Sequence, residues 1–192
     1  QLFEDIGIMR TMPNITINSV SDNVMARRLA ETSRGMQTAN YIRLERHINP
    51  DIYSTKEDFS DGFQILNEGT DGFIISNGFM LWKAFKVRDE LKKNNINVGV
   101  IDLHTYPCNE EKLSEKLAQA PSVVTIEESF LPCGMGSYVM EMLGDRHIHK
   151  NIKRFGVRKE WIYRYGGREH NHEYHGIDIA TLKKEAKLFF GV

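Results

Sequence analysis

Apolar and polar residues alternate with two different periods along the chain, and the alternation predicts an α/β fold. Short runs of β-branched or alternating apolar residues predict strands at residues 14–20, 41–44, 73–76, 98–103, 123–126 and 152–157. Apolar residues at helical spacing predict helices at residues 3–12, 79–93, 109–118 and 178–190. One more helix is predicted from a cap at Ser21 or Asp22 to about Thr38, and another from near Ser137. Because strands and helices alternate, we expect a mostly parallel, doubly wound sheet.

The order of these elements predicts an incomplete first unit followed by a full domain. Residues 1–48 hold too few elements to form a core of their own, so they are interpreted as the tail of an α/β domain. Residues 49–68 are rich in Pro, Asp, Ser and Gly and show little regular pattern, which predicts a linker. Residues 69–192 carry enough strands and helices for an independent domain.

The stretch from Ser122 to Leu143 predicts a strand, a glycine turn and a helix. Glu127, Glu128 and Ser129 are expected to take the chain out of the sheet, and Gly134 and Gly136 to form the turn. Such a turn can cradle a phosphate at a helix N-terminus. It can also belong to a dinucleotide-binding fingerprint, although Val139 stands where the third glycine is required. A tight turn in a scaffold domain is the simplest interpretation, because a lone Gly-x-Gly is common.

Composition narrows the class of protein. The 192 residues carry a formal net charge of −1 and no basic stripe interleaved with aromatics, which argues against a nucleic-acid partner. Apolar runs are far shorter than the ~20 residues that span a bilayer, and no signal peptide opens the chain. Cys108 and Cys133 lie far apart in the sequence, so we expect a reducing, cytoplasmic setting. The chain begins at Gln1, as expected of a piece of a longer protein.

Several short motifs, in one order along nearly the whole chain, resemble the C-terminal part of the transketolase family of thiamine-diphosphate enzymes. The matching segments are Glu4-Asp5-Ile6, Met9 to Asn14, Ser21-Asp22, Tyr41 to Arg46, Ile75 to Gly78, Ile101 to Thr105, Val124 to Glu128, Gly134 to Ser137 and Phe155 to Arg158. No single motif is specific, but the ordered set is. Residues 1–48 then resemble the end of the pyrimidine-binding domain, and residues 69–192 resemble the family's C-terminal domain.

The resemblance implies an enzyme whose active site lies between two domains of a dimer and holds thiamine diphosphate and Mg²⁺. The glutamate that activates the cofactor, and the diphosphate and metal ligands, would precede Gln1, so the chain alone is expected to be inactive and to bind no cofactor. The implied reaction is transfer of a two-carbon ketol unit between sugar phosphates, with the missing N-terminal half as partner. A 2-oxo acid dehydrogenase β chain, a deoxyxylulose phosphate synthase and a non-catalytic assembly module remain open. Leu44-Glu45-Arg46 favours transketolase over the first two.

Arg46 is the one site residue that the resemblance carries over. It matches the arginine that contacts the sugar phosphate in transketolases, and a guanidinium presents a rigid fork of donors that suits phosphate oxygens. The end of a strand in an α/β sheet is also where ligands bind. Glu45 departs from the family pattern, which often has Ser or Gly at this position. A carboxylate beside the site would oppose a phosphate, so the identity of the substrate stays open.

Two further clusters of side chains are candidate sites. His170, His172 and His175 could ligate zinc, but no cysteine accompanies them and the family implies no metal there, so we interpret them as part of a solvated loop. The aromatic group Trp161, Tyr163 and Tyr165 is predicted to serve packing or an interface.

Overall fold

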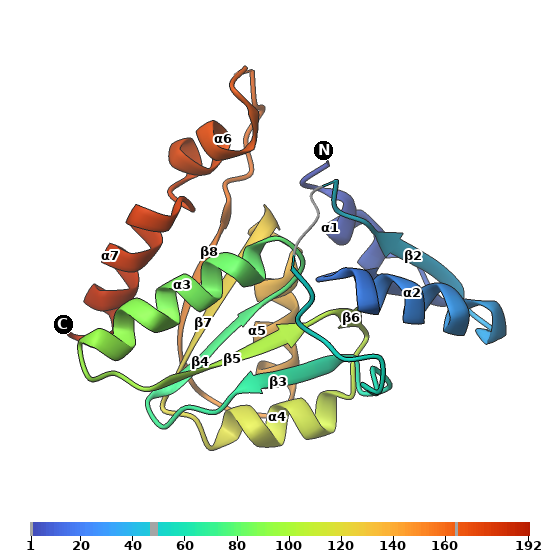
Figure 1. The fold of residues 1–192 in the computed structure, drawn as a ribbon, viewed down its shortest axis with the longest axis horizontal. Coiled ribbons are helices and arrows are strands. Elements are labelled where there is room, and N and C mark those ends of the chain that lie inside the picture. Colours follow the sequence, from blue (N-terminus) through green and yellow to red (C-terminus); the bar gives the residue numbers. More distant parts are fainter. Residues whose placement is uncertain (1, 47–49, 164) are drawn as a thin grey trace.

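The computed structural model describes residues 2–46, 50–163 and 165–192, which form two β-sheets (Figure 1). The smaller sheet has three strands in the order β2-β1-β6, and the larger has five in the order β3-β5-β4-β7-β8. The N-terminal segment, residues 2–46, supplies β1 and β2, and the C-terminal segment, residues 63–192, supplies the other strands. The prediction of an α/β fold with a mostly parallel sheet is confirmed.

The N-terminal segment follows the predicted order of helix, strand, helix, strand. Its elements are α1 (Asp5–Arg10), β1 (Ile15–Ser19), α2 (Asn23–Thr32), a 3₁₀ turn at Ser33–Gly35 and β2 (Ala39–Arg43). Asp22 caps α2, because its carboxylate accepts a hydrogen bond from the Met25 amide at 2.8 Å. This helix ends at Thr32 rather than at Thr38, since Ser33 and Gly35 are poor helix formers.

The smaller sheet draws on both segments. β1 and β2 pair in parallel, and β6 (Thr105–Tyr106), which comes from the C-terminal segment, pairs antiparallel with β1. Ile17 lies opposite Tyr106 and Asn18 opposite Thr105. The N-terminal segment is therefore tied to the C-terminal segment by backbone hydrogen bonds as well as by side chains.

The larger sheet lies between two helical layers. Its strands are β3 (Phe63–Asn67), β4 (Gly72–Ser76), β5 (Val98–Leu103), β7 (Ser122–Phe130) and β8 (Asn151–Val157). α3 (Met80–Lys93) and α7 (Ile179–Phe190) cover one face, and α4 (Glu110–Ala118) and α5 (Met135–Asp145) cover the other (Figure 1). Successive strand residues alternate between the two cores, so Ile74 packs with α3 and Ile75 with α5. No helix of the described residues is long and apolar enough to cross a membrane.

Two strands differ from the sequence-based expectation. β3 lies inside the predicted linker and pairs antiparallel with β5 at the edge of the sheet. Only Phe63 of β3 is fully buried, which is why no apolar alternation revealed it. β7 runs on through Glu127, Glu128 and Ser129, which were expected to leave the sheet. These three residues are buried. Amides of α5 donate to Glu127, side chains of a later helix bind Glu128, and Ser129 donates to Glu127 within the strand.

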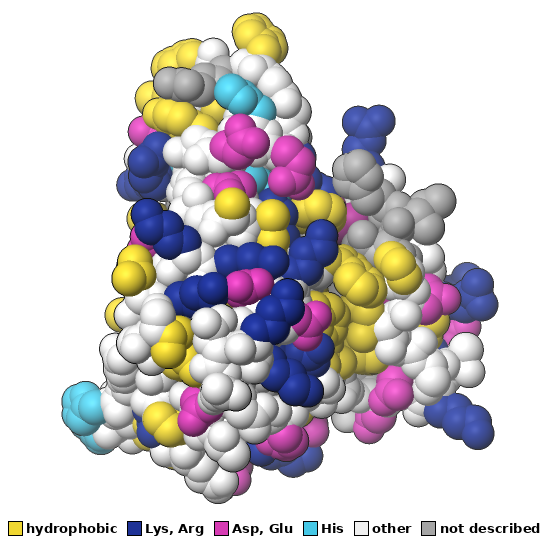
Figure 2. Space-filling model, turned by 60° about the vertical axis from the view of Figure 1, so that its left-hand side comes forward, with side chains coloured by type: hydrophobic (Ala, Val, Ile, Leu, Met, Phe, Trp, Pro, Cys, Tyr) yellow, Lys and Arg dark blue, Asp and Glu magenta, His cyan; other side chains and the backbone are white. Residues whose placement is uncertain are grey.

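The region after β8 also differs. The residues expected to form a solvated histidine loop instead form α6 (Gly167–His175). The chain between β8 and α6 protrudes from the domain, and hydrophobic side chains lie at the top of the space-filling view (Figures 1 and 2). Trp161, Tyr163 and Tyr165 are 86%, 84% and 99% exposed, so they do not pack within this chain, and a role at an interface stays a prediction.

Candidate functional site

The chain order places a candidate site at the carboxyl ends of β4 and β7. The connection after β4 leads through α3 to β5 on one side, whereas β7 continues through α5 to β8 on the other. In open α/β sheets, ligands bind in the crevice where the strand order reverses in this way. Here the N-terminal segment contacts the residues at these strand ends. The Gly78 amide donates to Ser21 Oγ at 3.1 Å, and Arg43 Nη2 donates to the Glu128 carbonyl at 3.3 Å.

A buried chain of charged groups starts beside this crevice, at Glu128 near the end of β7. Glu128 Oε1 lies 2.6 Å from His172 Nε2, and His172 Nδ1 lies 2.5 Å from Lys83 Nζ. Because an ammonium only donates, Nδ1 is the acceptor and the ring hydrogen on Nε2 points to Glu128. Burial lowers the pKa of Lys83, and the exposed carboxylate of Glu169, at 3.0 Å, opposes this shift. The histidine is therefore a structural bridge between α3, α6 and β7.

Arg168 extends the chain of charges to the N-terminal segment. Its Nε donates to Glu128 Oε1 at 2.9 Å and its Nη2 to Glu45 Oε2 at 2.6 Å. The guanidinium carbon also lies 4.2 Å from the centre of the Phe79 ring. Burial alone would raise the pKa of Glu128, but the hydrogen bond from His172 and the charge of Arg168 outweigh burial and lower it.

Arg46, the predicted phosphate ligand, lies three residues beyond the end of β2 and is exposed. It makes no hydrogen bond or ion pair with another described residue. Its neighbours differ: Arg43 Nε is bound to Asp5 Oδ2 at 2.6 Å, and Glu45 is bound to Arg168. Of the charged side chains at this strand end, Arg46 alone is left without a described partner.

The glycine turn is occupied by the protein's own carboxylate. Glu127, which is fully buried, accepts hydrogen bonds from the Met135 amide at 2.6 Å and the Gly136 amide at 2.9 Å, the first amides of α5. A Cβ at Gly136 would lie 2.9 Å from Glu127 Oε1, so glycine is needed for this close approach. The turn therefore does not fit a diphosphate, and the interpretation as a scaffold turn is supported.

The histidine cluster is divided between different environments. His172 is bound to Glu128 and Lys83, His175 is buried beside the Arg158 amide, and His170 is exposed. Among the described ranges of the chain, no group of three or more His, Cys, Asp or Glu residues could hold a metal ion. The three histidines thus do not converge on one point in the described part of the chain, and the absence of zinc stays a prediction.

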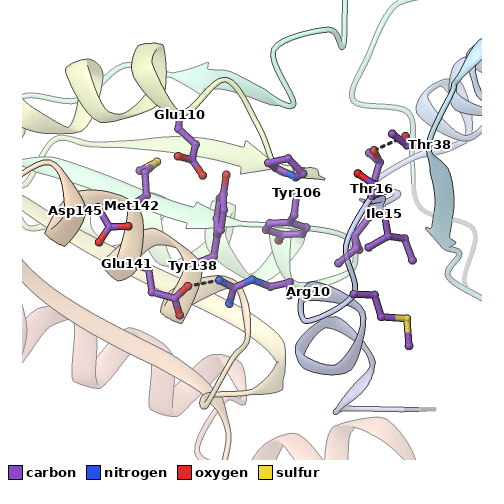
Figure 3. Close-up of a pocket in the computed structure, with 14 residues that line it drawn as sticks. Arg10, Ile15, Thr16, Thr38, Tyr106, Glu110, Tyr138, Glu141, Met142 and Asp145 are labelled. Atoms are coloured by element: carbon purple, nitrogen blue, oxygen red, sulfur yellow. Dashed lines mark hydrogen bonds and ion pairs between the residues drawn. The ribbon is translucent and has the colours of Figure 1, made fainter.

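A cavity of about 550 Å³ lies on another side of the junction, between β1 and α5 (Figure 3). Arg10 reaches from α1 along its wall, where it pairs with Glu141 and donates to the carbonyls of Cys133 and Gly134 at 2.9 and 3.1 Å. The Arg10 guanidinium also lies 5.2 Å from the centre of the Tyr138 ring. These contacts of Arg10 hold α1 against α5.

Sequence reasoning did not single out Lys83, Glu128, His172 or Arg168 as a cluster. One local signal was present: Lys83 stands three residues after Met80 on the buried side of α3, where a lone charge requires a partner. The partners come from elements far away in the sequence, so no spacing rule could have identified them.

The comparisons with known proteins agree with the geometry. The family described as "Transketolase, C-terminal domain" matches residues 62–182, which is more than half of the chain. The chain belongs to this family of transketolase C-terminal domains.

Individual relatives refine the picture. The "Putative transketolase C-terminal section" of Methanocaldococcus jannaschii is 27% identical over 187 residues, covering 96% of this chain and 58% of the relative. A 1-deoxy-D-xylulose-5-phosphate synthase of Exiguobacterium sibiricum is 29% identical over 189 residues, covering 96% of this chain and 30% of that enzyme. A solved structure titled "Split gene transketolase, inactive beta4 tetramer" superposes with a TM-score of 0.90 at 26% identity, covering 100% of this chain and 63% of its own. The chain thus spans less than two thirds of these relatives.

Proposed function

We propose that this chain is the C-terminal section of a thiamine-diphosphate-dependent transketolase that transfers a two-carbon ketol unit between sugar phosphates. In this proposal the chain contributes an assembly scaffold and part of the substrate-phosphate site. The observation that carries the proposal is Arg46, an exposed guanidinium beyond the end of β2 whose charged neighbours are already paired. A guanidinium that is not paired with another described residue can donate charge-assisted hydrogen bonds to a phosphate.

The cofactor is assigned to the missing N-terminal half. The only helix N-terminus at a Gly-x-Gly turn in the described part of the chain is already capped by Glu127, and no set of metal ligands accompanies it. When bound in the complete enzyme, thiamine diphosphate with Mg²⁺ would supply the carbanion chemistry of ketol transfer. The residues of this chain then bind and orient the phosphate end of the substrate.

The smaller sheet supports the need for a partner. Within the described residues, β2 pairs with β1 along one edge only, which leaves its other edge without a strand. An unpaired edge is a template for a strand from another chain or segment. We propose that the N-terminal half completes this sheet, and that the complete enzyme is a homodimer in the cytoplasm.

A second candidate reaction is favoured by the relatives. Since a 1-deoxy-D-xylulose-5-phosphate synthase matches almost the whole chain, synthesis of a deoxyketose phosphate from pyruvate and an aldose phosphate is the alternative. Assay of the reconstituted enzyme with a ketose phosphate donor and with pyruvate separates the two. Turnover with the ketose donor supports transketolase, and carbon dioxide release from pyruvate supports the synthase.

The isolated chain is expected to fold without binding thiamine diphosphate or catalysing ketol transfer. Its larger sheet has two cores of its own, but the described residues lack a diphosphate and metal site. Titration calorimetry with thiamine diphosphate and Mg²⁺, first on the chain alone and then with the N-terminal half added, is the test. Micromolar binding by the chain alone would contradict the assignment. If the reconstituted mixture forms a stable complex by light scattering but shows no activity, a non-catalytic assembly module would be favoured.

Replacing Arg46 with alanine is expected to raise KM for a phosphorylated acceptor by roughly 10- to 100-fold in the complete enzyme, with little change in kcat. The reason is loss of a charge-assisted contact worth ~1.5–3 kcal/mol in both ground and transition states. KM for the same acceptor without its phosphate should stay unchanged. Arg34→Ala, at an exposed arginine after α2, is the matched control. An equal loss on both acceptors would remove Arg46 from the phosphate site.

A further inference from the structure

We infer that Arg168 is a positioning residue for the substrate-phosphate site, because it neutralises Glu45 beside Arg46. This inference rests on the proposed function, and it assigns to α6 of the C-terminal segment a part in phosphate specificity. Without such neutralisation, a carboxylate next to Arg46 would oppose the binding of a phosphate there. Glu45 would repel the phosphate or pair with Arg46, and either effect would weaken binding.

In the structure, Glu45 pairs with Arg168 and not with Arg46. Its carboxylate oxygen Oε2 lies 2.6 Å from Arg168 Nη2, and the two side chains are only 17% and 13% exposed. Partial burial reduces solvent screening, so the two charges compensate each other more fully than an exposed pair would. Glu45 and Arg46 follow one another in the chain, yet the structure pairs the first inward and leaves the second exposed.

Arg168 is itself held in place before any substrate arrives. Nε is bound to Glu128 at 2.9 Å, and the guanidinium carbon lies over the Phe79 ring. Glu128 is bound in turn to His172, one helical turn after Arg168 on α6. Burial on its own would lower the pKa of Arg168, but the hydrogen bond to Glu45 and the charge of Glu128 outweigh burial and raise it. The positive charge is thus preorganised at the position of Glu45.

The same contacts could serve only to tie the two segments together, and a double-substitution experiment separates the two roles. If Arg168 neutralises Glu45, Arg168→Met exposes an uncompensated carboxylate, whereas Glu45→Gln removes the need for neutralisation. The double variant should then behave like Glu45→Gln. A simple tie predicts instead that Glu45→Gln, Arg168→Met and the double variant are equally impaired, because each of them breaks the same contact.

The experiment measures steady-state kinetics on the complete, reconstituted enzyme with a phosphorylated acceptor and with its unphosphorylated analogue. Inorganic phosphate as a competitive inhibitor gives a second readout. We expect Arg168→Met to raise KM for the phosphorylated acceptor and Ki for phosphate about tenfold, which corresponds to ~1.4 kcal/mol. Neither Glu45→Gln nor the double variant should change them more than about twofold, a range within the usual error of additivity. KM for the unphosphorylated analogue should stay constant throughout.

Two outcomes would overturn the inference: a double variant as impaired as Arg168→Met, or an equal loss on both acceptors. If Arg168→Met does not fold by circular dichroism, Arg168→Lys keeps the charge and should retain most of the phosphate affinity. Failure of the proposed function looks different. If Arg46→Ala leaves phosphate binding intact, the site is misplaced, whereas an effect of Arg46→Ala without one of Arg168→Met overturns the positioning role alone.

Discussion

Replacing Glu127 with alanine is expected to destabilise the chain by about 3–5 kcal/mol, because several buried donors lose their common acceptor. The Met135 and Gly136 amides and the Ser129 hydroxyl all donate to this carboxylate. The helix that begins there, α5, packs directly against the larger sheet, so water cannot easily replace the lost acceptor. Urea unfolding followed by circular dichroism measures the free energy of unfolding.

Two companion variants test the cause of that loss. Gly136→Ala should also be strongly destabilising, since its Cβ would lie 2.6 Å from Thr125 Oγ1 and 2.9 Å from Glu127 Oε1. Glu115→Ala, at an exposed position of α4, should change stability by no more than about 0.5 kcal/mol. If Glu127→Ala is as mild as Glu115→Ala, the carboxylate does not secure the start of α5.

Replacing Asp102 with asparagine is expected to make the chain more stable at neutral pH. Asp102 is fully buried, and burial raises its pKa to about 7, although the hydroxyl groups of Tyr53 and Ser21 oppose the shift. A raised pKa means that the folded state favours the protonated acid. The stability that this provides is complete below the unfolded pKa, near 4, and is lost as the pH rises toward 7.

Unfolding at a series of pH values tests this prediction. Wild-type stability should fall between pH 4 and pH 7 by an amount on the order of 4 kcal/mol from this group, at about 1.4 kcal/mol for each pH unit. Asp102→Asn should reduce the slope by that amount, because asparagine is neutral and can still accept from Tyr53. A slope from Glu127 should remain, since burial raises its pKa to about 7 as well. Asp61→Asn is a control of opposite sign: hydrogen bonds from Lys112 and Asn109 lower the pKa of Asp61. A slope that is unchanged in Asp102→Asn would show that Asp102 does not contribute to it.

Local sequence patterns predicted much of the fold, because helix caps and buried strands depend on interactions between residues that are close together in the sequence. The cap predicted at Ser21 or Asp22 is Asp22, since a capping side chain bonds to amides two or three residues away. Asn109 and Asp178, where apolar spacing predicted two further helices to begin, cap their helices in the same way. The buried strands β4 and β5 were legible from their continuous apolar runs.

The sequence did not reveal which buried charged residues are paired by residues far away along the chain. Glu128 looks like a residue that leaves a strand, and only His172 and Arg168, some forty residues later, make its burial possible. α6 has no apolar stripe to reveal it, and its contacts to Lys83 and Glu128 hold it in place. Arg46 could be placed at a strand end, but the ion pair between Glu45 and Arg168 could not be inferred from the residues around Arg46.

The exchange of elements between the two segments has a consequence for protein engineering. A cut at the exposed Thr55 would leave Tyr53, whose hydroxyl bonds to Asp102, on the first fragment and β6, which pairs with β1, on the second. Each fragment would then carry a piece that the other needs to bury its polar groups. Such fragments are suited to complementation, in which two halves expressed separately report the proximity of the proteins fused to them.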